Sequence, residues 1–370
     1  MTEYKVQHFV PQWYQRNFTA NPDAKENEMS IWVFSIESRK MELNPIYQTA
    51  AEDDFYGRIT EESLQDLEKK TSTSINSLIK CKYIKGLSPT SVENIRIFLL
   101  LQSARTKTAK DITEKAVNRI LETEIRPKFR LIYKDSPEKL DYIDALDLSD
   151  ADFFIWNMRM AIASVVGITD LSGYLLINRT DLPFVSSDHP VVINNYFFKR
   201  QTSPGFLTPG LQIFCPISDS LYVLFVHVDL YEFLSKGKNC IEITDKKDVN
   251  SLNILQLLNC HRHILSNQNC GDYLNSLLTE SDKIRKKNPN YANIEANNFG
   301  IKFSFIKINN QANRLIPQYS KMGRSAKARG ITRTDGPFRN EELMLETWKQ
   351  TEGIITQCLE EYQVKQETSL

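Results

Sequence analysis

The sequence has no net charge and no hydrophobic segment long enough to cross a membrane. Lys+Arg and Asp+Glu each total 46 among 370 residues. Without an overall positive field, nucleic acid would have to be bound through a local basic patch. No apolar run approaches the roughly 18 residues of a membrane span, so we expect no membrane partner. A composition of 41% hydrophobic and 25% charged residues is typical of a globular protein with one large domain or two closely packed ones.

Paired cysteines and the common catalytic motifs are also missing. The six cysteines form no CxxC pair, and the first residues show no signal-peptide pattern, which predicts free thiols in the cytoplasm. The sequence contains no GxxxxGK[ST], GxGxxG, GxSxG or EF-hand motif, which argues against a P-loop ATPase in particular. His261 and His263 are two residues apart on an expected helix, so they do not form an HExxH-type zinc pair.

Hydrophobic periodicity and turn signals predict the secondary structure. A strand rich in β-branched and aromatic residues, a polar turn and a returning segment indicate a hairpin over 31–47. Ser88-Pro89 is a helix start signal, and we expect that helix to run through Arg105 towards Ile125. The other expected elements are helices at 61–80 and 150–166, strands at 171–178, 183–194 and 211–228, helices at 248–267 and 271–286, a strand at 299–308 and a helix at 340–363.

This order predicts an α+β fold that is helix-rich, with a central, mainly antiparallel sheet and an N-terminal β-hairpin. We expect a first unit over 1–290, followed by an extension over 291–370 with a strand, a basic loop and an amphipathic helix. The subdivisions of the first unit are a helical part at about 60–167, a sheet part at about 171–230 and helices at 248–286.

An aromatic box at His8–Phe18 stands out because chain termini rarely carry so much apolar mass unless they dock. Docking would carry His8 and Gln12 into the body of the protein, where they could serve catalysis. The alternative is a structural plug whose histidine caps a neighbouring loop.

Three further polar residues are candidates for the same site. Asp188, beside a proline between two strands, suits a metal ligand, a general base or the partner of His8, or else an Asx-turn. Arg105 follows a strongly apolar helical segment and needs an anionic partner, either Asp188, Glu68 or a ligand phosphate. Glu68 lies on the helix at 61–80, where a solvated face is the alternative.

A basic concentration lies at 321–339, where six Lys and Arg residues face a single acid. Phosphates of DNA or RNA are its natural partners, and a solvated loop is the alternative because few aromatics are interleaved. The candidate nucleic-acid-binding residues are Arg324, Lys327, Arg329 and Arg333.

The box and several later motifs together resemble a bacterial family, the domain-of-unknown-function family 4238. The box matches the family pattern His-Phe-[Ile/Val]-Pro-Gln-x-Tyr-x-x-x-Phe. The later matches, over roughly 4–268, are Ile31–Phe34, Phe55-Tyr56, Leu67-Glu68, Gln102–Thr106, Ser187–Pro190 and Asn253. The family more often has Asn where His189 stands, so His189 is not counted as a required group. Some relatives look like single-gene defences against phage, and the resemblance therefore implies an antiphage role.

Three hypotheses about the function follow. In the first, the protein is an abortive-infection-type effector, a nuclease or other phosphoester hydrolase, with His8, Gln12, Arg105 and Asp188 as its catalytic residues. Asp188 and Glu68 would bind a divalent metal such as Mg²⁺, His8 would act as acid or base, and Arg105 would steady the phosphate charge.

In the second reading, the protein is a non-catalytic sensor or binding module whose polar residues lock the box to the core. A nucleotide-processing enzyme is a third option. The partners that these readings imply are nucleic acid or a phage component, and a second copy of the chain in a homo-oligomer.

Overall fold

The computed structural model describes residues 6–56, 58–145, 150–197, 205–233, 239–287, 300–316, 318, 325 and 338–368. Helices predominate over residues 58–163, between the N-terminal strands and the strands of the five-stranded sheet. The helices are α1 Gln12–Gln15, α2 Arg58–Cys81, α3 Pro89–Ala104, α4 Lys107–Ile120, α5 Arg126–Ile132, α6 Pro137–Ala145, α7 Asp150–Ala163, α8 Lys246–Asn259, α9 Gly271–Lys287 and α11 Glu341–Thr368.

The strands form two larger sheets and two strand pairs. They are β1 Val6–His8, β2 Ser30–Ser35, β3 Met41–Pro45, β4 Ala51–Asp53, β5 Ser172–Asn178, β6 Ser186–Ser187, β7 Val192–Asn195, β8 Leu211–Pro216, β9 Leu221–Val226, β10 Tyr231–Phe233, β11 Cys240–Ile243, β12 His263–Ser266 and β13 Ile306–Ile308. The five-stranded sheet has the order β11-β5-β9-β8-β7 and the four-stranded sheet β3-β2-β12-β6, while β1 pairs with β4 and β10 with β13. All these pairings are antiparallel except β11 with β5.

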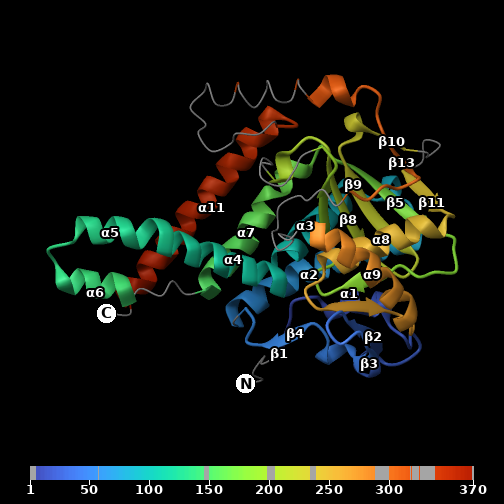
Figure 1. Ribbon diagram of the computed structural model, residues 1–370, viewed down its shortest axis with the longest axis horizontal. Coiled ribbons are helices and arrows are strands. Elements are labelled where there is room, and N and C mark those ends of the chain that lie inside the picture. The colour runs from blue at the N-terminus through green and yellow to red at the C-terminus, as the bar shows by residue number, and fades with distance from the viewer. Residues whose placement is uncertain are drawn as a thin grey trace.

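The centre of the five-stranded sheet is buried on both faces, which explains why its central strand β9 is hydrophobic throughout. Alternate residues of β9 enter different hydrophobic clusters: Val223 and Phe225 pack with residues of α2, α3 and α7, whereas Leu224 and Val226 pack with residues of α8 and α9. Because side chains alternate across a strand, the sheet is the middle layer between two sets of helices (Figure 1). The α+β fold class, the mainly antiparallel sheet and the hairpin, now β2–β3, are therefore confirmed.

Two helices end earlier than the sequence predicts. The helix that begins after Ser88 stops at Ala104, because the Thr106 hydroxyl accepts the Ala109 N–H and caps a new helix, α4. The expected helix at 248–267 stops at Asn259, and His263 instead opens β12, which pairs with β2 and β6. The predicted helical setting of His261 and His263 was therefore wrong.

The C-terminal segment packs onto the rest of the structure. The strand expected at 299–308 is limited to β13, because Asp248 accepts hydrogen bonds from the backbone N–H and the hydroxyl of Ser304 just before it. Phe305 and Ala312 join the hydrophobic cluster of α8 and α9. In Figure 1, α5 and α6 reach away from the sheets as an arm, and α11 runs obliquely past α7. Within the described ranges, no helix has the length and apolar character that a membrane crossing requires.

Candidate functional site

Arg105 is the centre of a buried network that joins the N-terminal strand to α2 and α3. Its guanidinium has an internal partner at every nitrogen: Nε donates to the Tyr56 hydroxyl at 3.1 Å, Nη1 to Glu68 Oε1 at 2.7 Å and Nη2 to the His8 carbonyl at 2.9 Å. The Arg105 side chain is 2% exposed and that of Glu68 is 26% exposed. Of the partners expected for Arg105, Glu68 is thus the one present, and each guanidinium nitrogen donates to a protein group.

Burial and the neighbouring groups of this network shift the pKa of two of its members. Burial lowers the pKa of Arg105, but the neighbouring Tyr56 and Glu68 outweigh burial and the net pKa is raised. Burial, with a smaller contribution from Arg105, lowers the pKa of the His8 imidazole against the opposing effect of Glu68. His8 Nε2 hydrogen-bonds the Tyr47 carbonyl at 3.1 Å. The backbone carbonyl of His8 therefore accepts a hydrogen bond from Arg105, while the His8 ring contacts the segment around Tyr47.

The aromatic box is docked through side chains other than the two predicted ones. The Tyr14 hydroxyl lies 2.8 Å from Ser186 Oγ and donates to the Pro216 carbonyl at 2.6 Å. Gln15 Nε2 donates to the carbonyls of Val10 and Thr49. Gln12 remains partly exposed, and its hydrogen bond within the described residues is a long one, 3.4 Å, from Arg16 on the same turn. Gln12 is therefore not among the hydrogen-bond partners of Arg105 in the described part of the chain.

Asp188 holds a turn rather than facing Arg105. Its Oδ1 accepts the His261 N–H at 2.7 Å, and its Oδ2 accepts the N–H groups of Arg262 and His263 at 2.8 and 2.9 Å. These three donors follow the end of α8, so Asp188 fixes the turn from α8 into β12. Burial raises the pKa of Asp188, against the three N–H groups and His263, which lower it.

Beside Asp188, two histidines lie along the first turns of α4. A hydrogen bond of 2.6 Å joins His189 Nδ1 to the Thr106 hydroxyl. Burial, followed by the charge of His261, lowers the pKa of His189 to about 4. His261 Nε2 lies 3.2 Å from Asp111 Oδ2, with side chains 25% and 31% exposed. Thr106 and His189 therefore form the buried end of this cluster, and Asp111 and His261 its solvent-facing end.

The predicted metal ligands have separate protein partners, Glu68 on Arg105 and Asp188 on the turn after α8. In the part of the chain that the structure describes, no three His, Cys, Asp or Glu side chains are grouped to hold a metal ion.

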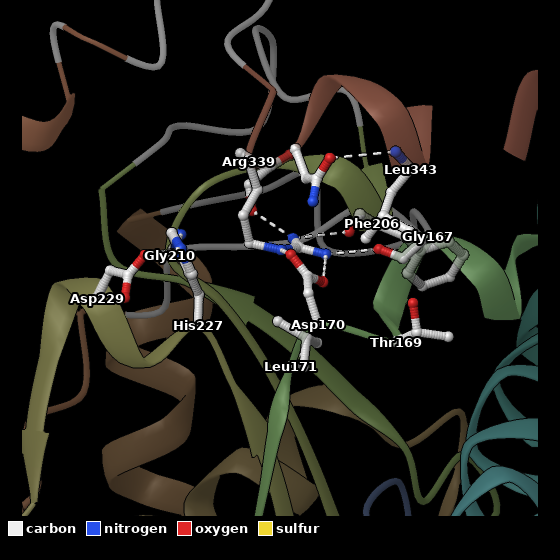
Figure 2. A network of polar contacts seen from close by, with 12 residues as sticks. Gly167, Thr169, Asp170, Leu171, Phe206, Gly210, His227, Asp229, Arg339 and Leu343 are labelled. Atoms are coloured by element: carbon white, nitrogen blue, oxygen red, sulfur yellow. Dashed lines mark hydrogen bonds and ion pairs between the residues drawn. The ribbon is translucent and has the colours of Figure 1, made fainter. Parts of the chain in front are cut away.

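The predicted nucleic-acid-binding residues Arg324, Lys327, Arg329 and Arg333 lie outside the described residues. Arg339, the last residue of the basic stretch, is described and is buried. It donates from Nε and Nη2 to the two carboxylate oxygens of Asp170 at 2.8 and 2.9 Å, and its remaining bonds go to backbone carbonyls of Gly167, Phe206 and Thr208. Figure 2 shows this guanidinium enclosed by its acceptors, with His227 close by. Arg339 is thus a structural cation and not a surface contact for nucleic acid.

The sequence matches a protein-family profile over more than half of its length. The sequence profile described as "Protein of unknown function (DUF4238)" matches residues 6–269. The chain belongs to the DUF4238 family. Neither the comparison with curated proteins nor that with solved structures gives a match. The DUF4238 match ends after β12, so α9, β13 and α11, together with Arg339, lie beyond it.

Of two amides that organise the DUF4238 region, Asn253 was noted from the sequence as a family match, whereas Gln256 was not singled out. Gln256 accepts the Ser187 hydroxyl and donates to the Pro190 carbonyl and the Tyr222 hydroxyl, and Asn253 bonds the backbone of Val185 and Pro183. Both lie on the buried face of α8. An amide among the apolar residues of a helix face is the signal that could have identified Gln256, because buried polar groups require partners.

Proposed function

We propose that the protein is an antiphage defence protein of the sensor or binding type, in which the predicted polar residues lock the N-terminal box to the core. The observation that carries this proposal is that the three guanidinium nitrogens of Arg105 and both carboxylate oxygens of Asp188 are used by internal partners. A group that stabilises a phosphate or binds a metal needs donors or lone pairs directed at that ligand. These two groups direct theirs at the protein.

The experiment compares stability with protection. Arg105→Met, Asp188→Ala and wild type are tested for melting temperature and for efficiency of phage plating on cells that carry them. If these residues hold the N-terminal box on the core, the melting temperature and the protection should fall together in both variants. Loss of protection at the wild-type melting temperature would overturn the structural role of these residues.

The second candidate function is phosphoester hydrolysis by a nuclease-type effector, and the Asp111–His261 pair favours it. A carboxylate that holds one nitrogen of an imidazole leaves the other nitrogen available for proton transfer. Here Asp111 holds His261 Nε2 at 3.2 Å, which leaves Nδ1 as the general base, and both side chains reach solvent. In this second candidate, acid–base chemistry is proposed at the start of α4 instead of at His8.

His261→Asn and Asp111→Asn test this second candidate. Both side chains are partly exposed, so the melting temperature should stay within about 2 °C of wild type, as for surface substitutions in a chain of this length. A hydrolytic site predicts that protection is lost in both variants. Asp141→Asn, the same exchange at an exposed position of α6, is the matched control. Full protection by the His261 and Asp111 variants would exclude the pair from function.

A further inference from the structure

A pocket of about 270 Å³ lies between the strand pair β10–β13 and the β7–β8 side of the five-stranded sheet. Among the described residues, Tyr196, Gln212, Tyr231, Phe303 and the isoleucines of β13 contribute to its lining. Its volume is slightly below the roughly 300–1,000 Å³ of pockets for drug-sized ligands. A single flat ring system with a short substituent fits such a space, whereas a polynucleotide does not.

The aromatic walls of the pocket are fixed by contacts outside it. The Tyr231 hydroxyl donates to the Gly210 carbonyl at 2.6 Å, which holds a ring that is 4% exposed. The Phe303 ring packs on Phe214 and Phe305, with centroids 5.5 and 5.1 Å apart. Walls that are already ordered need little rearrangement to receive a flat ligand, and an aromatic side chain offers a stacking surface for a nucleobase.

Gln212 supplies a buried amide with one hydrogen-bonding group to spare. The residue is 4% exposed, and its Oε1 accepts the Asn194 Nδ2–H at 2.6 Å across the β7–β8 pair. Its Nε2 has no hydrogen-bond partner among the described residues. The atom is also not fully enclosed by the protein. Because Gln212 lines the pocket, this N–H group is available to an acceptor on the edge of a ring. Glutamine reads base edges in this way in protein–nucleic acid complexes.

The charge of the described lining is positive. It includes Lys302 and Lys307 and no Asp or Glu. Lys307 stands opposite Glu232 in the β10–β13 register, so Lys302, which is exposed, is the cation that we assign to a ligand. An ammonium group at the edge of an apolar pocket favours a ligand with a phosphate or another anionic substituent.

We infer that this pocket binds a mononucleotide, with the base against the aromatic walls, its acceptor edge on Gln212 Nε2 and its phosphate on Lys302. The inference rests on the proposed binding role and names its ligand. The lining favours a ligand with three features: a flat ring, a hydrogen-bond acceptor on the edge of that ring, and an anionic group. A nucleoside monophosphate combines all three.

The test is calorimetric titration of the full chain with AMP, GMP, CMP and UMP, with adenosine and ribose 5-phosphate as partial ligands. We expect at least one nucleotide to bind more tightly than either partial ligand. Lys302→Ala should weaken that nucleotide about tenfold, in keeping with the loss of one charge-assisted contact, and should leave adenosine unchanged. Lys283→Ala, at an exposed position on α9, is the matched control. Gln212→Leu should weaken both nucleotide and nucleoside.

Binding of none of the four nucleotides would overturn the assignment, and so would equal loss in the Lys302 and Lys283 variants. Stronger binding of ribose 5-phosphate than of any nucleotide would show an anion site without a base pocket and would also overturn it. Since Lys302 is exposed, its variant keeps the test valid if Gln212→Leu fails to fold. Failure here leaves the proposed function standing, because that function is judged by the melting temperature and protection of the Arg105 and Asp188 variants.

Discussion

Arg339 and Asp170, 169 residues apart, form a two-bonded ion pair in which the arginine side chain is 1% exposed and the aspartate 26%. The pair joins the segment that leads into α11 to the segment between α7 and β5. Since residues 6–269 match the family profile, this contact ties the region beyond the match to the family unit. The buried face of the pair is completed by backbone carbonyls, so no part of the guanidinium is left without an acceptor.

We predict that Arg339→Met destabilises the protein by about 3 kcal/mol or more, because breaking a buried ion pair leaves an uncompensated partner. The loss should appear in urea unfolding and as faster amide hydrogen exchange in α11. Arg179→Met, which removes an exposed pair with Glu242 (side chains 51% and 60% exposed), should cost less than about 1 kcal/mol. Equal effects of the two substitutions would contradict the anchoring role of Arg339.

The same reasoning applies to Arg105, with a different readout. Arg105→Met removes the donors to Tyr56, Glu68 and His8 together, and we expect a loss of about 3 kcal/mol in the free energy of unfolding. Hydrogen exchange should become faster in β1 and in the first part of α2. Lys128→Met, which breaks an exposed pair with Glu124 on the arm, is the control and should change stability by less than about 1 kcal/mol. Unchanged exchange in β1 would show that the N-terminal strand does not depend on Arg105.

Local signals in the sequence were sufficient where the deciding contact is local. Ser88-Pro89 predicts the start of α3 because the cap lies within the first turn: Ser88 accepts the Ser91 N–H. The β2–β3 hairpin follows from two strands joined by a short polar turn. That Arg105 needs an anionic partner was also anticipated, because a buried guanidinium requires one, but the sequence left Asp188, Glu68 and a ligand phosphate as alternatives.

The sequence misled where the deciding contact is long-range. The helix expected over 248–267 ends at Asn259 because Asp188, more than 70 residues earlier, accepts the N–H groups of residues 261–263. In the sequence, Arg339 belongs to a basic stretch that suggests an exposed surface. The fold instead brings Asp170 to Arg339 and buries the guanidinium. The sequence singled out His8 and Gln12 in the box, whereas Ser186 and Pro216, far away along the chain, hold Tyr14.

Asp188→Asn should weaken the turn from α8 to β12 while the shape of the side chain is kept. The amide has one oxygen, so it cannot accept all three N–H groups, and its own NH₂ group would face a donor. We expect a loss of about 2 kcal/mol in stability, in the range for leaving a buried group without its partner. Amide exchange at residues 261–263 should increase more than exchange in β5, which does not contact the carboxylate. Protection of these amides at the wild-type level would show that the turn is held by other contacts.

Protonation of His189 should make stability depend on pH between about 4 and 6.5. Its pKa is lowered to about 4 in the folded protein, whereas an unfolded chain has a histidine pKa of about 6.5. In this window the unfolded state binds the extra proton, so stability falls as the pH is lowered and rises as the pH is raised. Between pH 7 and pH 5 the loss from this residue is about 2 kcal/mol. His227, whose pKa burial and Arg339 also lower to about 4, adds a similar loss. Urea unfolding of His189→Asn at both pH values should show a pH dependence smaller than wild type by about the share of His189. An unchanged difference between pH 7 and pH 5 would mean that His189 takes up its proton equally well in the folded protein.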